Sequence, residues 1–172
     1  GAWSAPVHLP LRTLPGRAEM EARVAIARAR YEALKKAGAS YLEIQNANVI
    51  ALGEEDSLAF VLLKEKGVRI GFVEDELPTE VQVIGLGDAR IVALPGEVFV
   101  EFGGIIQKAS PFPKTFVVTV SNGILPGYVC TEEAYKAGTY EAGASLLTSE
   151  AGEIFTGIAA KLLRQSRQAG DE

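Results

Sequence analysis

Residues 115–120, Thr-Phe-Val-Val-Thr-Val, form the most apolar strand pattern in the chain. Five of these six residues are β-branched, and β-branched side chains pack well on a pleated sheet. Pro111 and Pro113 interrupt the chain just before this run, and a loop containing Gly and Pro follows it. Continuous apolar character of this kind is typical of a strand covered on both faces. We therefore predict that residues 115–120 are the central strand of a sheet covered by helices on both sides.

Shorter strand-like runs precede this segment. They occupy residues 68–73, 80–86 and 89–94. Gly87-Asp88 separates the last two runs and predicts a hairpin that makes them antiparallel neighbours. A further extended segment is expected over residues 7–12, where Pro10 and Pro15 limit its length.

Helical periodicity dominates residues 15–67 and returns after the predicted central strand. In the first part we predict helices over residues 16–37, 39–52 and from Glu54 to about Lys66, with Gly38 ending the first of them. In the second part we predict helices over residues 98–108, after a Thr131 cap, and over residues 149–168. Helices that alternate with strands predict an α/β fold, with a mixed sheet flanked by helices and a helical N-terminal third.

Composition excludes several classes of protein. The formal net charge of −5 argues against non-specific nucleic-acid binding, which needs clustered basic residues. No run approaches the roughly 20 apolar residues that a transmembrane helix requires. Cys130 and His8 are the single cysteine and histidine, so an internal disulfide, a cysteine-based zinc site and a histidine-rich metal site are not expected within this chain. The start at Gly1, without an initiator Met or a signal-peptide pattern, leads us to expect a processed or engineered boundary.

Three loops carry residues suited to chemistry. In Leu94-Pro95-Gly96-Glu97 a strand passes through Pro-Gly into a predicted helix, which would place Glu97 at the helix N-terminus, either as a functional carboxylate or as an ordinary helix-start acid. The second loop, residues 121–128, contains Asn122 and ends at Tyr128, which could also be a packed loop aromatic. The third, residues 138–145, surrounds Tyr140 and Glu141 with small residues but matches neither the P-loop nor the dinucleotide-binding pattern.

Taken in order, these loops resemble the motifs of the neutral (non-lysosomal) ceramidase family, and more closely its shorter bacterial ceramidase-like members. The resemblance rests on Leu94-Pro95-Gly96-Glu97, on Asn122 with Gly127-Tyr128, and on Tyr140-Glu141-Ala142-Gly143-Ala144-Ser145. It is clear from about Thr79 to Ala151 and weaker over the helical first third. The loop from Asn122 to Tyr128 is one residue longer here than in the family pattern.

The resemblance implies a mononuclear zinc amidase that cleaves an N-acyl bond in a small-molecule or lipid-like substrate. It implies that Glu97 and Tyr128 are zinc ligands, that Tyr140 donates a hydrogen bond to the substrate carbonyl, and that Asn122 contacts the substrate. The family's two zinc-binding histidines and its serine-containing region lie upstream, in an N-terminal half that this sequence lacks. Residues 1–172 are therefore expected to be the C-terminal part of a catalytic domain, with residues 68–172 carrying the site motifs. By the same resemblance the intact protein would be secreted or periplasmic.

Two oxygen ligands without histidine are expected to hold zinc weakly or not at all, so the chain alone should be inactive. A second hypothesis is a non-catalytic domain that keeps the fold and uses its tyrosine-bearing loops to bind a ligand. A third is a nucleotide or sugar-phosphate binder with an anion at the helix that starts near Glu97, although the charge of Glu97 would repel that anion.

Overall fold

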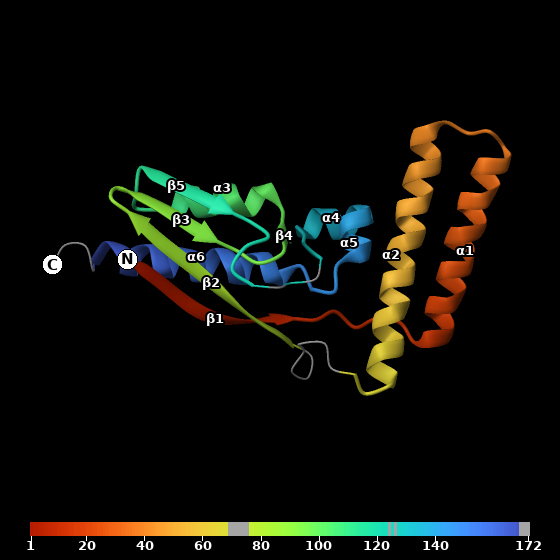
Figure 1. Cartoon of the computed structure of the whole chain (residues 1–172), viewed down its shortest axis with the longest axis horizontal. Helices are drawn as coiled ribbons and strands as arrows, with labels where there is room; N and C mark the ends of the chain where they lie inside the picture. The colour runs from red at the N-terminus through yellow and green to blue at the C-terminus, as the bar shows by residue number, and fades with distance from the viewer. Residues whose placement is uncertain (69–75, 124, 126, 169–172) are drawn as a thin grey trace.

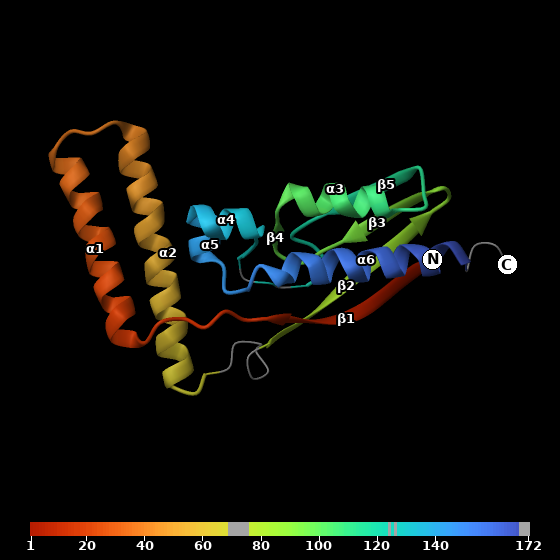
Figure 2. The ribbon, with the colours of Figure 1, turned by 180° about the vertical axis from the view of Figure 1, so that it is seen from behind.

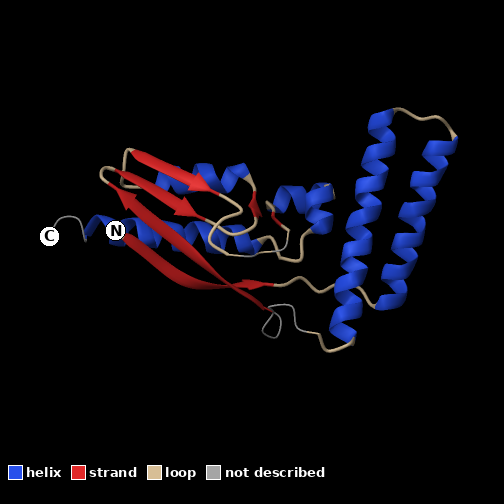
Figure 3. Ribbon diagram, viewed as in Figure 1, coloured by secondary structure: helices blue, strands red, loops and turns tan. Residues whose placement is uncertain are grey.

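The computed structural model describes residues 1–68, 76–123, 125 and 127–168, and confirms the α/β class (Figures 1 and 3). Four strands form one mixed sheet in the order β1-β2-β3-β5. Their bounds are Ala2–Pro10 for β1, Glu76–Leu86 for β2, Ala89–Ala93 for β3 and Lys114–Val118 for β5. The first two pairings are antiparallel and the β3–β5 pairing is parallel. A separate two-stranded sheet joins β4, Glu97–Val98, to β6, Tyr128–Val129.

The hairpin predicted at Gly87-Asp88 is confirmed, with β2 and β3 antiparallel on either side of it and Gly87 at a φ of 57°. The strand predicted over residues 68–73 falls, apart from Val68, outside the described residues. The first strand is longer than predicted, because β1 begins at Ala2 and pairs with β2 along its whole length. Its alternating residues Trp3, Ala5, Val7 and Leu9 pack toward the core, a period of two that is typical of a strand with one buried face.

The prediction of a doubly covered central strand at residues 115–120 is wrong. The strand β5 lies at an edge of the sheet, and its residues Phe116 and Val118 are 57% and 44% exposed. The reason is that α3, Val100–Ala109, and α6, Glu150–Gln168, both cover the same face of the sheet, as Figure 2 shows from behind. Thr115 and Val117 of β5 turn toward that face, where Val117 packs against the core and Thr115 contacts the hydroxyl of Ser110. A β-branched run therefore indicated a strand without fixing its place in the sheet.

The core lies between the sheet and these two helices. One row of side chains crosses all four strands on the covered face, from Trp3 through Val83 and Val92 to Val117. The largest side chains that are almost completely buried there are Phe155, Leu9, Leu94, Ile106, Leu147 and Leu163. Because protein interiors are close-packed, the spacing between α3 and α6 depends on the small residue Gly152, which faces the ring of Phe102.

Two helices, α1 at Arg17–Lys36 and α2 at Tyr41–Glu65, form an antiparallel hairpin at one end of the molecule (Figure 1). The three helices predicted for this region are therefore wrong in number, since α2 runs without a break through Glu54. A capping box between Ser40 and Glu43 fixes the start of α2. Gly38, just beyond α1, has a φ of 64° and ends that helix as predicted. The N-terminal third thus contains β1 followed by this hairpin.

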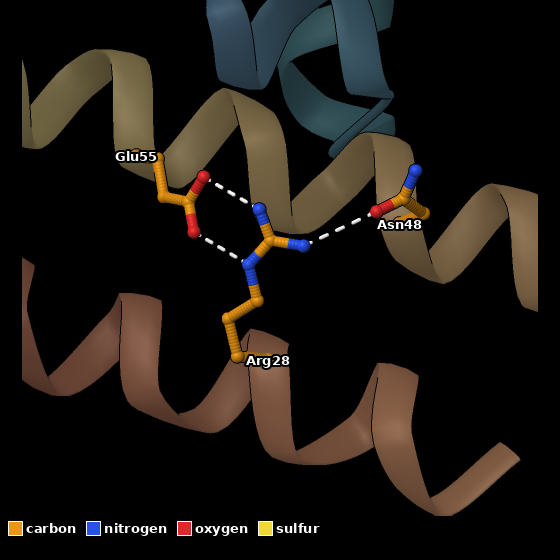
Figure 4. A network of polar contacts seen from close by, with 3 residues as sticks. All are labelled: Arg28, Asn48 and Glu55. Carbon is orange, nitrogen blue, oxygen red and sulfur yellow. Dashed lines mark hydrogen bonds and ion pairs between the residues drawn. The ribbon is translucent and has the colours of Figure 1, made fainter. Parts of the chain in front are cut away.

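A polar contact joins the two helices of the hairpin (Figure 4). The guanidinium of Arg28 donates through Nε and Nη2 to the two carboxylate oxygens of Glu55, and through Nη1 to Oδ1 of Asn48 at 3.1 Å. The hydrogen bonds from Arg28 hold the pKa of Glu55 below its ordinary value. Glu55 therefore faces α1 from the middle of α2. It does not lie in the first turn of a separate helix starting at Glu54.

The short helices α4, Glu132–Ala137, and α5, Tyr140–Ala144, link the hairpin to the sheet, since α5 packs against α2. Thr131 caps α4 as predicted, accepting a hydrogen bond from the backbone N–H of Ala134 at 3.3 Å. Thr139 caps α5 in the same way. Of the helices in the described part of the chain, none has the length and apolar character needed to cross a membrane.

Candidate functional site

The two-residue strands β4 and β6 bring Glu97 beside Tyr128. These residues are direct partners in a parallel pairing. The backbone N–H groups of Glu97 and Phe99 donate to the carbonyls of Gly127 and Val129, each at 3.1 Å. Glu97, predicted to lie near a helix N-terminus, has an extended backbone and lies two residues before Phe99, the N-cap of α3.

The hydroxyl of Tyr128 is held as a protonated phenol. Burial, followed by a hydrogen bond with Glu97 and the charge of that carboxylate, raises the pKa of Tyr128 to about 12. At neutral pH the pair therefore consists of one carboxylate and one hydroxyl donor. Such a pair can accept and donate hydrogen bonds at neighbouring positions.

Tyr140 completes a group of three side chains. Its ring meets that of Tyr128 edge-on, with ring centroids 5.9 Å apart and an interplanar angle of 73°. On its other side it packs against Gly53 of α2, where a Cβ atom would lie 3.4 Å from the ring carbon Cε2. This is an ordinary van der Waals distance, so Tyr140 and Ala144 of α5 pack directly on α2 at Gly53.

A cavity of about 370 Å³ collects three of the four predicted site residues. Its lining comprises Glu97, Gly127, Tyr128, Tyr140 and Ala144, together with Asp56, Ala59, Phe60 and Leu63 from α2. Glu97, Tyr128 and Tyr140 were predicted from the loop motifs. The wall from α2 was not predicted. Asp56, Ala59, Phe60 and Leu63 fall within one predicted helix, but the packing of that helix beside α5 depends on contacts between distant segments.

The structure places Asn122 away from this cavity. Its side-chain Nδ2 donates to the carboxylate of Glu80 at 3.1 Å and lies 3.4 Å from the carbonyl of the same residue, on β2. Its backbone has a φ of 56°, a left-handed conformation that asparagine tolerates better than most residues. Asn122 therefore attaches the loop after β5 to strand β2 of the sheet.

A turn with special backbone geometry sets the position of Glu97. Gly96 has a φ of 78°, and a Cβ atom there would overlap the side chain of Leu125. Val120 donates its backbone N–H to the Gly96 carbonyl at 2.9 Å while holding a φ of 52°, which is unusual for a β-branched residue. The loop after β5 is thus fastened directly to the residue before Glu97.

The side chain of Ser145 fixes the backbone of Tyr128. Its hydroxyl is fully buried, donates to the carbonyl oxygen of Tyr128 at 2.7 Å and accepts from the N–H of Leu147 at 3.1 Å. The hydroxyl of Tyr135 lies 3.0 Å from Oγ of Ser145 and donates to the carbonyl of Leu147 at 2.6 Å. Ser145, the residue directly after α5, is thus tied to β6.

Ser145→Ala should release this anchor. Leaving the Tyr128 carbonyl without its donor is expected to cost about 1–3 kcal/mol of unfolding free energy. Local hydrogen exchange should also rise at the amides of Glu97 and Phe99, which bond to the neighbours of Tyr128. Ser166→Ala is the matched control, because Ser166 is equally buried but bonds to Arg90 at the far end of the core. If exchange at Glu97 and Phe99 is the same in Ser145→Ala and Ser166→Ala, the anchor has no such role.

The described residues hold no group of three or more histidine, cysteine, aspartate or glutamate side chains placed to bind a metal ion. Glu97 and Tyr128 together offer two oxygen donors, whereas zinc usually takes four ligands. His8, on β1, instead pairs through Nδ1 with Glu76 at 2.9 Å. Among the described residues, these two oxygen donors alone fall short of the four ligands of a zinc site.

The cavity also bears on the phosphate-binding hypothesis. Its described lining contains the carboxylates of Asp56 and Glu97 and neither lysine nor arginine. An anion would meet these two like charges, and no basic side chain of the described lining would offset them. The described lining therefore does not favour a nucleotide or a sugar phosphate.

Solved structures similar to this chain include two of ceramidases. The neutral ceramidase from Pseudomonas aeruginosa is 20% identical over 54% of this chain and 16% of its own, with a TM-score of 0.49. A ceramidase complexed with C2 is 22% identical over 55% of this chain and 15% of its own, with a TM-score of 0.47. The matched half of this chain thus corresponds to about a sixth of the length of either protein. No family model and no curated protein matches the sequence. We therefore argue function from the chain's own residues.

Proposed function

We propose that this chain is the C-terminal portion of the catalytic unit of a zinc-dependent N-acyl amide hydrolase and is inactive without an N-terminal half. The supporting observation is the cross-strand pairing of Glu97 with Tyr128, beside Tyr140, in one cavity. These are the residues to which the ceramidase-like motifs assign zinc binding and contact with the carbonyl.

In this proposal Glu97 and Tyr128 contribute half of the zinc ligands, and the remaining ligands come from the N-terminal half. A zinc ion bound in this way lowers the pKa of a coordinated water and polarises a carbonyl. Tyr140 orients the amide by donating its hydroxyl hydrogen to the carbonyl oxygen. The apolar side chains of Ala59 and Leu63, on the opposite wall, accommodate the apolar part of an N-acyl amide or lipid-like substrate.

Reconstitution tests this proposal. The chain is mixed with its N-terminal half, and bound zinc and hydrolysis of an N-acyl amide are measured. We expect stoichiometric zinc in the complex, and zinc affinity at least about tenfold weaker in Glu97→Gln and in Tyr128→Phe. Glu101→Gln, an exposed carboxylate outside the cavity, is the control and should bind zinc normally. Full zinc retention in both site variants would refute the assignment of the ligands.

A second candidate function is a non-catalytic ligand-binding domain. It is favoured by the two-donor set at Glu97 and Tyr128, which is incomplete within the described residues. The same reconstitution separates the two functions, because a binding domain would give a complex that contains no zinc and does not hydrolyse amides.

A further inference from the structure

The side chain of Arg12 joins the segment after β1 to the last turn of α5. Its Nη1 donates to the carbonyl of Ala142 at 3.1 Å, and its Nη2 donates to the carbonyl of Gly143 at 2.6 Å. Carbonyls at the end of a helix have no partner within that helix, and basic side chains commonly bind them. Arg12 therefore caps the C-terminal end of α5 from a distant part of the sequence.

The backbone around Arg12 is itself fixed. The N–H of Arg12 donates to the carbonyl of Leu146, just beyond α5, at 2.9 Å. The preceding residue, Leu11, forms an antiparallel bridge with Leu147. Because β1 pairs with β2 along its whole length, Arg12 extends from a segment that the sheet and this backbone pairing both hold.

The guanidinium of Arg12 is partly buried, and one of its donors is unpaired. Its Nε is buried and has no hydrogen-bond partner among the described residues. Burial lowers the pKa of Arg12, while the nearby Tyr135 and Glu54 act in the opposite direction. An unpaired buried donor reduces stability. The presence of Arg12 is therefore better explained by the position that it gives to α5 than by its own contribution to stability.

The contact with Arg12 bears directly on Tyr140. Tyr140 is the first residue of α5, and the two carbonyls that Arg12 binds belong to the second and third residues after it. With five residues, α5 makes little more than one turn, so its two ends move together. Tyr140 also contacts Gly53 of α2 and the ring of Tyr128. The direction of the Tyr140 hydroxyl thus depends on where Arg12 fixes α5.

We propose that Arg12 is a positioning residue for Tyr140, holding α5 so that the Tyr140 hydroxyl is directed at the reacting carbonyl. The consequence for catalysis rests on the proposed function, in which that hydroxyl donates to the carbonyl oxygen. The position of the ring requires neither zinc nor the N-terminal half. Arg12 and Gly143 line a separate cavity of about 260 Å³, so Arg12 acts through α5 and not on the substrate.

Arg12→Met tests the position of Tyr140 in the 172-residue chain alone. Methionine keeps an unbranched stem and removes every donor of the guanidinium. The nuclear Overhauser contacts between the rings of Tyr128 and Tyr140 should weaken severalfold, because the end of α5 is released. Arg23→Met is the matched control, since Arg23 lines the same 260 Å³ cavity but pairs with Glu19 of its own helix. It should leave the ring contacts unchanged. Unchanged ring contacts in a folded Arg12→Met chain would overturn the proposal.

The reconstituted complex tests the effect on catalysis. Arg12→Met should lower kcat by about 10–100-fold, since a reacting group displaced by about 1 Å can lose about 10²-fold in rate. Bound zinc should be unchanged, because separate backbone hydrogen bonds hold Glu97 beside Tyr128. In the Tyr140→Phe background the same substitution should lower kcat by less than about twofold, because the hydroxyl that Arg12 positions is already absent. Equal losses in the two backgrounds would contradict the proposal, as the effect would not pass through Tyr140.

Arg12→Lys keeps the test decisive if Arg12→Met does not fold. Lysine retains the charge but replaces the planar fork by a single amine, so the ring contacts and kcat should still fall below those of the wild type. Wild-type values of both would rule out the contact with two carbonyls as the positioning element. A complex that takes up no zinc would refute the hydrolase function, while the ring contacts of the isolated chain would still decide the role of Arg12. Zinc-dependent hydrolysis that Arg12→Met leaves unchanged would refute only the role of Arg12.

Discussion

Gly152→Ala should lower the free energy of unfolding by about 3 kcal/mol, the upper part of the usual range for an overpacked core. Gly152 is buried on α6 and faces the ring of Phe102 on α3, and a Cβ atom added there would overlap that ring. Phe102 is only 6% exposed, so its ring has little room to move away. The two helices would have to separate above the sheet. For a chain of this size the loss corresponds to a fall of about 6–12 °C in Tm, measurable by calorimetry.

Gly157→Ala provides the control on the same helix. Gly157 is exposed, and an added Cβ atom would meet nothing within 4 Å. The identical substitution should therefore stabilise the protein by about 0.5–1 kcal/mol, because alanine loses less backbone entropy than glycine on forming a helix. A Tm for Gly152→Ala equal to that of the wild type would show that the contact between α3 and α6 is looser than the structure indicates.

Sequence patterns predicted the elements of this fold better than their arrangement. The turn at Gly87-Asp88, the Thr131 cap and the helix end at Gly38 depend on local backbone chemistry, and the structure confirms all three. The place of β5 in the sheet depends on which face the helices cover, which is set by contacts between distant segments. The prediction also divided α2 at Gly53. The side chain that packs on this glycine is Tyr140, which is distant in the sequence, so local patterns could not reveal the contact.

In the candidate site, too, the residues were predicted better than their arrangement. The loop motifs singled out Glu97, Tyr128 and Tyr140, and the structure places all three around one cavity. The pairing of Glu97 with Tyr128 could not be predicted, because β4 and β6 have only two residues each and carry no strand pattern. Asp56 was assigned to a helix start, so its place on the cavity wall was also missed. Whether these residues have the predicted chemical roles is decided by experiment.

Tyr140→Phe should lower kcat strongly without removing zinc. If the Tyr140 hydroxyl donates to the oxygen of the reacting carbonyl, its removal should reduce kcat of the reconstituted enzyme by about 10²–10³-fold, as for other donors to a developing oxyanion. Phenylalanine keeps the ring that packs on Gly53 and meets Tyr128, so the fold and the arrangement of Glu97 and Tyr128 should be preserved. Bound zinc should then equal that of the wild type. The measurements are kcat, KM and zinc content of the complex with the N-terminal half.

Tyr41→Phe is the control, because Tyr41 is 80% exposed at the start of α2 and its hydroxyl lies outside the cavity. It should leave all three quantities unchanged. Tyr128→Phe should lose zinc and activity together, whereas Tyr140→Phe should lose kcat alone, with little change in KM. That difference matters because the loss of an interaction made only in the transition state lowers kcat and kcat/KM equally, while a missing metal ligand first lowers the fraction of active enzyme. An unchanged kcat in Tyr140→Phe would remove the hydroxyl from the reaction and leave its ring as a packing group between α2 and α5.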